Sequence, residues 1–341
     1  MQVPDTLADL IGNPAWLAHR YDPGHDALHF RWVDRSRHAA TTFLTEEALA
    51  DAPGPVPVAR ADTAPPATAP LHFIFHSAYC CSTMLARAFD APGTSMALKE
   101  PLLLNDMVGW RRRGGEPARV AEVLDRTLAL LARPFAPGEA VVVKPSNVVN
   151  ALAPVILALR PEAKALLLHA PLPAYLRSIA KKDMWGRLWV RELLIGLLKD
   201  GLVDLGFDTE GYLGLTDLQV AAVGWLAQQA LFARTVAQYG PARVATLDSE
   251  TLVARPREAM GALVRLYGLS IDAVGIDAIV AGPAFTRHSK LSAEFGAVER
   301  AAEHRNAADL HGDEIAKVVV WAEATAKAAG IPLTLGASLI D

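Results

Sequence analysis

Residues 77–83, Ser-Ala-Tyr-Cys-Cys-Ser-Thr, are mostly small or polar and join a short apolar segment to a run of helix-forming residues. A strand, a tight loop and a helix in this order can bind an anion. The reason is that the first amides of a helix have no partner within it, and the helix dipole adds partial positive charge there. Small side chains would let a phosphate or sulfate reach these amides, and the hydroxyls of Ser82 and Thr83 would add donors. We therefore predict an anion site at this loop.

The same pattern also fits a buried strand that simply turns into a buried helix, as in many α/β proteins. The phosphate loop G-x-x-x-x-G-K-[ST] is absent, because no glycine lies between Leu71 and Pro92 and no lysine precedes Ser82. An ordinary ATPase or GTPase is therefore disfavoured. Cys80 and Cys81 have no histidine or aspartate pattern beside them, so we interpret them as packing residues of the loop and not as nucleophiles.

The elements that must position this loop follow an α/β pattern from residue 71 onward. Short apolar segments alternate with helical patterns, as a parallel sheet covered on both faces requires. The strands are expected at residues 73–75, 96–99, 140–145, 163–169 and 243–248. We predict a P-loop-like α/β fold with a parallel sheet of about five strands flanked by helices, a helical cap and an N-terminal β-hairpin appendage.

The chain divides into three predicted parts. Residues 1–50 form the appendage, with a hairpin at residues 29–33 and 39–44, and the Pro- and Ala-rich residues 51–70 form a linker. The α/β domain then spans residues 71–341, with a helical insertion at about residues 184–240. Trp185, Trp189 and Trp225 in that insertion are interpreted as core or cap packing.

Composition and charge narrow the class of protein. The 52% hydrophobic and 21% charged residues are typical of a globular protein, and a net charge of −4 argues against broad nucleic-acid binding. The first residues lack the features of a signal peptide, and no stretch is apolar enough to span a membrane. We expect a cytoplasmic protein without nucleic-acid or membrane partners, and leave open whether it forms a homodimer. Two adjacent cysteines provide neither a disulfide framework nor a zinc site.

Several segments together resemble the sulfotransferase family, enzymes that use 3′-phosphoadenosine 5′-phosphosulfate (PAPS), and most closely its protein-tyrosine and Golgi-type branch. In that family a strand leads into a loop [RK]-S-G-[ST]-T that holds the 5′-phosphosulfate. Residues 79–83 occupy that place, with Ser82 and Thr83 matching. Glu100 follows Tyr79 by 21 positions, the spacing at which that branch has its base.

Later segments extend the resemblance over roughly residues 71–268. Lys144-Pro145 looks like the lysine and proline that end a later strand of the family, residues 161–178 resemble its strand and serine-bearing helix, and residues 244–256 resemble a further strand–helix segment. Tyr79 stands where the family loop has a basic residue. Ala170, eight positions before Ser178, stands where an arginine grips the 3′-phosphate.

The resemblance implies transfer of a sulfuryl group from PAPS, as co-substrate, to a hydroxyl or amine of a small molecule or peptide, without a metal. Sulfuryl transfer, like phosphoryl transfer, depends on positioning and charge stabilisation. Glu100 would act as base and Lys144 would stabilise the transferring group. The alternative for Glu100 is a surface carboxylate paired with Lys99. The alternative for Lys144 is a lysine that extends from a strand end toward solvent. The resemblance assigns donor binding to Tyr79, Cys80, Cys81, Ser82, Thr83, Arg87, Arg177, Ser178 and Lys290.

Because this arginine is missing, the identity of the donor is left open. His169, beside Ala170, is a poor substitute near neutral pH because its reference pKa is about 6.5. Either Arg177, Arg287 and Lys290 supply the contact, or the donor is not PAPS. An atypical P-loop nucleotide-dependent kinase is one alternative, with Asp248 as a second acid for Mg²⁺. A catalytically inactive nucleotide-binding module is another.

Overall fold

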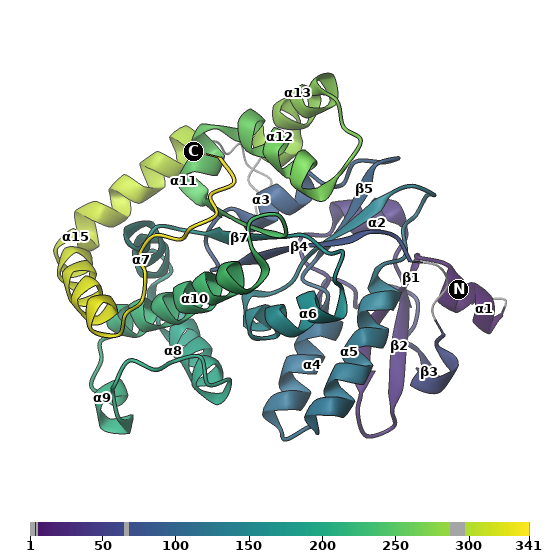
Figure 1. Cartoon of the computed structure of the whole chain (residues 1–341), viewed down its shortest axis with the longest axis horizontal. Coiled ribbons are helices and arrows are strands. Elements are labelled where there is room, and N and C mark those ends of the chain that lie inside the picture. The colour runs from purple at the N-terminus through teal and green to yellow at the C-terminus, as the bar shows by residue number, and fades with distance from the viewer. Residues whose placement is uncertain (1–3, 5, 65–67, 287–296, 341) are drawn as a thin grey trace.

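The computed structural model describes the chain except for residues 1–3, 5, 65–67, 287–296 and 341, and gives only the helical backbone of residues 297–310. Figure 1 shows a central sheet with helices on both faces and a small N-terminal sheet at one side. Within the described residues, no helix combines the length and the apolar character needed to cross a bilayer.

The main sheet has five parallel strands, which confirms the predicted fold class. In spatial order these are β5 (Ser95–Lys99), β6 (Ala140–Lys144), β4 (Leu71–His76), β7 (Ala165–His169) and β8 (Val244–Asp248). The chain builds β5 and β6 on one side of β4 and then crosses to build β7 and β8 on the other. In such a sheet ligands bind beyond the carboxyl ends of the strands where the order reverses. That point lies at the end of β4, where residues 77–83 begin.

Alternating side chains of β4 enter two cores, because successive residues of a strand point to opposite faces. Phe73 and Phe75 stack with ring centroids 5.4 Å apart on one face, whereas Ile74 belongs to the other core. The first core is closed by α4 (Leu102–Arg112), α5 (Pro117–Leu131), η2 (Asn147–Leu152) and α6 (Ala153–Leu159). The second is closed by α3 (Ser82–Arg87), α7 (Leu172–Ala180), α12 (Pro256–Tyr267) and part of α15 (Ala297–Ala328).

The N-terminal hairpin exists but is displaced from its predicted position. Its strands are β1 (Trp16–Asp22) and β2 (Ala27–Trp32), and the predicted linker contributes the third strand, β3 (Val56–Ala59). Residues 35–40, expected in a turn and return strand, form helix α2 (Arg35–Ala40), because the Asp34 carboxylate accepts from the Arg37 amide and caps it. The small sheet shares a core with the main domain, and Arg20 donates to both carboxylate oxygens of Asp106 in α4, at 2.9 and 3.0 Å.

Between α7 and β8 the chain forms α8 (Asp183–Lys199), α9 (Thr209–Leu213) and α10 (Asp217–Tyr239). The prediction of core or cap packing is confirmed for Trp225, which is 2% exposed. Trp185 stacks on Trp189 within α8, although it is 60% exposed. The remaining elements are α1 (Leu7–Gly12), η1 (Arg60–Asp62), α11 (Ser249–Ala254), α13 (Ala273–Ala281) and α14 (Pro283–Thr286).

His38 in α2 makes the stability of this fold depend on pH. Both ring nitrogens are buried and have no hydrogen-bond partner among the described residues, and burial lowers the pKa of His38 to about 3. The unfolded chain therefore binds a proton at His38 below about pH 6.5, whereas the folded chain binds it only below about pH 3. The free energy of unfolding is therefore highest above about pH 6.5 and decreases as the pH falls from there toward pH 3.

We expect His38 to lower the free energy of unfolding by up to about 1.4 kcal/mol for each pH unit below about pH 6. His38→Phe removes the titrating group and should flatten the profile by that amount. Urea denaturation of both proteins between about pH 7 and pH 5 measures the slopes. Parallel pH profiles for the two proteins would show that His38 is not responsible.

Candidate active site

The loop between β4 and α3 adopts left-handed backbone conformations without glycine. The φ angles are 71° at Ala78, 52° at Tyr79 and 62° at Cys81. Such conformations cost non-glycine residues about 1 kcal/mol or more each, and they persist where the surroundings enforce them, often at functional sites. Left-handed residues beside right-handed ones also turn successive amides toward one side, which forms an anion-binding concavity.

His76, the last residue of β4, fixes the start of the loop. Its Nδ1 accepts a hydrogen bond from the Ala78 amide at 3.1 Å. The ring proton therefore resides on Nε2, which donates to the Pro145 carbonyl at 3.0 Å. Pro145 directly follows Lys144, so the imidazole ties the loop to the end of β6. The sequence analysis did not assign His76 any role.

A buried amide pair holds the same loop from the side of α10. Asn150 Nδ2 donates to the His76 carbonyl at 2.9 Å and to Gln228 Oε1 at 3.0 Å. Gln228 Nε2 in turn donates to the Ser77 carbonyl at 3.4 Å. Ser77 Oγ accepts from the Ala170 amide at 3.1 Å, which links the loop to the end of β7. A sequence signal did exist, since Gln228 and Gln229 interrupt a long apolar helix.

Glu100 and Lys144 form an ion pair at the carboxyl ends of two adjacent strands. Lys99 and Lys144 are paired in the parallel register of β5 and β6, and the Glu100 amide donates to the Lys144 carbonyl at 2.7 Å. Lys144 Nζ donates to Glu100 Oε1. The Lys144 side chain is 1% exposed and that of Glu100 is 23% exposed, so solvent reaches the carboxylate and hardly the ammonium. Glu100 also has a left-handed φ of 55°.

Lys99, the alternative partner considered for Glu100, pairs with a different carboxylate. Lys99 Nζ contacts Asp90 Oδ2 at 2.7 Å and the Ala39 carbonyl at 3.3 Å. Burial lowers the pKa of Lys99 and raises that of Asp90, with the opposite charge of the partner acting against each shift. Lys99 and Asp90 are thus a buried structural pair, and Lys144 is the lysine that serves Glu100.

Lys144 lies beside the loop as well as beside Glu100. Burial raises the pKa of the Cys80 thiol, and the positive charge of Lys144 is the largest influence in the opposite direction. The buried thiol donates to the Leu168 carbonyl at 3.4 Å, which fits a packing residue. On the other side, Lys144 Nζ lies 5.0 Å from the centroid of the Phe43 ring. The structure therefore brings Glu100, Lys144 and the loop together.

Ser82 and Thr83 begin helix α3 directly after the left-handed Cys81. Both are buried, and no side chain caps the helix start. The first amides of this helix have no partner within it, so they are donors that a ligand can use. The structure thus places these two predicted donor-binding residues where the sequence analysis expected them, at the turn from loop to helix.

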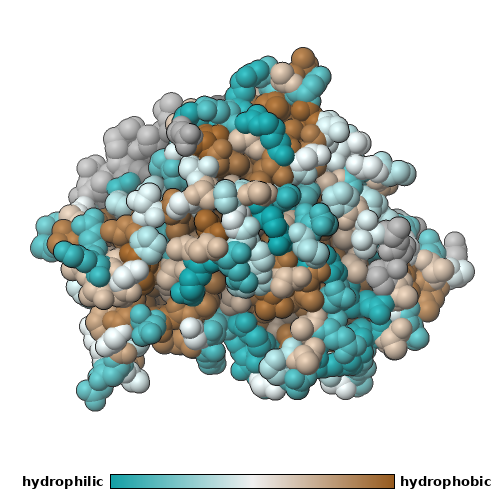
Figure 2. All heavy atoms as spheres, in the orientation of Figure 1, coloured by the Kyte–Doolittle hydropathy of each residue, from teal (hydrophilic) through white to brown (hydrophobic). Residues whose placement is uncertain are grey.

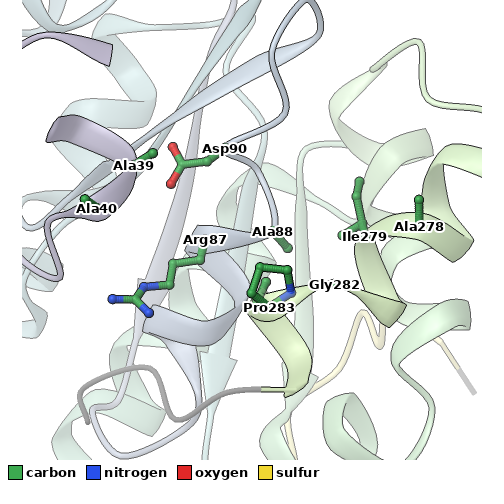
Figure 3. A pocket seen from close by; sticks show the side chains of 10 residues that line it. Ala39, Ala40, Arg87, Ala88, Asp90, Ala278, Ile279, Gly282 and Pro283 are labelled. Atoms are coloured by element: carbon green, nitrogen blue, oxygen red, sulfur yellow. The ribbon is translucent and has the colours of Figure 1, made fainter. Parts of the chain in front are cut away.

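Arg87 ends the same helix and borders a cavity of about 530 Å³ (Figure 3). The cavity lies between α2, α3, α13 and α14, and most of its lining residues are small and apolar. Arg87 Nη2 donates to Thr42 Oγ1 at 3.0 Å, while its Nε is buried without an acceptor among the described residues. Burial lowers the pKa of Arg87, with the charge of Asp90 acting against the shift. Because Asp90 is occupied by Lys99, the guanidinium remains suited to an incoming anion.

The remaining predicted donor-binding residues are not gathered at the loop. Ser178 Oγ donates to the Ala174 carbonyl at 2.9 Å within α7, and Arg177 lies in the last turn of that helix. In the part of the chain that the structure describes, no hydrogen bond links either side chain to the loop. Arg287 and Lys290 lie outside the described residues.

Ala170, at the position of the expected arginine, is fully buried. Its carbonyl accepts from Trp225 Nε1 at 2.8 Å, so this position belongs to the packed interior. Burial lowers the pKa of the neighbouring His169, with the charge of Asp248 acting against the shift, which supports a neutral imidazole near pH 7. These residues thus provide no fixed cation for a 3′-phosphate.

Asn147 is a further candidate that the sequence analysis missed. It follows Lys144 by three positions at the start of η2 and is 6% exposed. Its Nδ2 is buried without an acceptor among the described residues. An orphaned donor of this kind costs about 1–3 kcal/mol, so a ligand acceptor would stabilise it. Among the described residues, no three His, Cys, Asp or Glu side chains are grouped so that they could hold a metal ion.

Similar proteins are found among solved structures. No family model and no curated protein matches the chain. A search of solved structures finds, at probability 1.00, the sulfotransferase domain from the curacin biosynthetic pathway. The two are 17% identical, the alignment covers 72% of this chain and 98% of that one, and the TM-score is 0.40. A similarity at this level carries no argument about function, and the fold class rests on the observed sheet.

Asn150 should be a main support of the loop. Asn150→Ala leaves the His76 carbonyl and Gln228 Oε1 without their donor, so we expect a loss of about 1–3 kcal/mol in unfolding free energy. Ser178→Ala is the matched control, since it removes one bond within a single helix and should cost less than about 1 kcal/mol. Urea denaturation measures both variants. Equal losses would refute the special role of Asn150.

Proposed function

We propose that the protein transfers a sulfuryl group from PAPS to a hydroxyl or amine of a small molecule or peptide. The observation that carries this proposal is the Glu100–Lys144 ion pair beside the left-handed loop, at the point where the strand order reverses. A base, a cation and helix amides are the three groups that sulfuryl transfer needs, since the reaction depends on positioning and charge stabilisation.

In the proposed reaction a bond forms between the acceptor oxygen or nitrogen and sulfur, and the bond from sulfur to the bridging phosphate oxygen breaks. Glu100 takes the acceptor proton. The electron pair of the broken bond stays on the phosphate, which the amides of the loop and of α3 stabilise. Lys144 supplies positive charge to the peripheral oxygens of the transferring group and of the adjoining 5′-phosphate, which the product of the donor retains.

The residues fit the two ends of PAPS unequally. The loop, Lys144 and Arg87 suit the 5′-phosphosulfate, and the apolar cavity beside α3 offers room for the nucleoside. The 3′-phosphate has no such preformed site around Ala170. Asp248, the acid that the kinase alternative needs, caps α11: its Oδ1 accepts from the Glu250 and Thr251 amides, and its Oδ2 bonds to the Thr251 hydroxyl. We therefore favour sulfuryl transfer over a kinase reaction.

Titration calorimetry separates the proposal from its alternatives. We expect 3′-phosphoadenosine 5′-phosphate (PAP), the product of the donor, to bind with the same affinity with and without Mg²⁺. Binding of ADP that requires Mg²⁺ would instead support a nucleotide-dependent kinase. If PAP does not bind, the proposed donor is wrong.

Substitutions at the ion pair test the two roles separately. Glu100→Gln should lower turnover on an identified acceptor by about 10²–10⁴-fold, the usual contribution of a general base, while PAP affinity changes little. Lys144→Met removes the buried cation and should weaken PAP binding by about tenfold or more. Glu162→Gln, an exposed glutamate, is the control and should match wild type. Wild-type turnover in Glu100→Gln would eliminate Glu100 as the base.

A further inference from the structure

Helix α8 is apolar on two sides, although only one side is packed. Its inner side chains are buried against α7 and α10, whereas Met184, Trp185, Leu188 and Ile195 are each more than half exposed. A helix that is hydrophobic all round is normally covered all round, and contiguous exposed apolar surface marks interaction sites. Figure 2 shows hydrophobic residues in the lower left of the molecule, where Figure 1 places α8. We call Met184, Trp185, Leu188 and Ile195 the α8 stripe.

The charges at the start of the α8 stripe are mainly basic, in a chain whose net charge is −4. Lys181 and Lys182 precede the stripe and Lys199 ends the helix, all three exposed. Arg187 and Arg191 both pair with the carboxylate of Asp217. The segment from Lys181 to Asp217 holds these five basic side chains and seven acidic ones, of which only Asp183 lies at the start of the helix. The positive charge is therefore concentrated at the start of α8, at Lys181 and Lys182 beside Trp185.

Trp185 has the surroundings of an interfacial tryptophan. Lys182 Nζ lies 5.9 Å from the centre of its ring. Tryptophan with a neighbouring lysine suits the boundary between water and lipid, where the ring is buried at headgroup level and the lysine reaches the phosphates. Basic residues near an anionic bilayer each contribute to binding, and apolar side chains add insertion.

We propose that the α8 stripe docks the protein on an anionic membrane surface. This site would replace the sequence-based expectation of no membrane partner. The stripe is also continuous with the anion-binding loop, because Trp185 stacks on Trp189 with ring centroids 6.4 Å apart and Trp189 contacts the Tyr79 ring at 5.3 Å. A docked protein would hold the loop close to the bilayer. Vesicle binding does not depend on catalysis, so its failure would leave the proposed function intact.

Co-sedimentation with vesicles tests this proposal. We expect wild type to bind phosphatidylcholine vesicles containing phosphatidylglycerol more tightly than pure phosphatidylcholine vesicles, and to lose binding as salt is raised. Trp185→Ser with Leu188→Ser should reduce the partition coefficient by about tenfold or more, given the apolar surface removed. Lys182→Glu should weaken binding to the anionic vesicles only.

Val274→Ser with Val320→Ser is the matched control, because these valines are 75% and 66% exposed on other helices. Both double variants should keep the wild-type circular dichroism. The proposal is overturned if wild type does not bind the anionic vesicles, or if the control pair weakens binding equally. It is also overturned if sedimentation velocity shows a dimer that Trp185→Ser with Leu188→Ser dissociates, since a second copy would then cover the stripe.

Discussion

The site depends on a buried positive charge at the end of a strand. Lys144 is almost completely removed from solvent, and an ammonium in that position needs a partner because the cost of desolvating it is large. Glu100 provides the partner because β5 and β6 run parallel in a fixed register, so the residue that follows Lys99 lies next to Lys144. The pair is thus a consequence of the sheet itself. It also leaves the carboxylate partly open, as a base requires.

The loop beside this pair is built in an unusual way for an anion site. Glycine normally provides left-handed backbone at little cost, whereas here Ala78, Tyr79 and Cys81 adopt it. The cost is offset by contacts from three different elements: His76 at the end of β4, Asn150 in η2 and Gln228 in α10. The helices inserted between β7 and β8 therefore support the loop directly.

Much of this arrangement could be predicted from the sequence, and the reasons are local. The strands of the main sheet are short apolar runs bounded by charged or proline residues, and strand ends such as Lys144-Pro145 are visible in the chain. The N-terminal hairpin was placed wrongly, because β1 is buried along most of its length and lacks the alternation that marks a half-exposed strand. The partners of Glu100 and of the loop could not be predicted. Apart from His76, which directly precedes the loop, they lie between 44 and 151 positions away along the chain, and only the fold brings them into contact.

In the proposed site, the loop amides and Lys144 together hold the anionic end of a nucleotide. Backbone amide chemical shifts, followed while wild type and Lys144→Met are titrated with PAP, test it most directly. We expect the largest changes at residues 79–83 in wild type, and smaller changes at these residues in the variant. Changes confined to other parts of the sheet edge, with the amides of residues 79–83 unaffected, would contradict it.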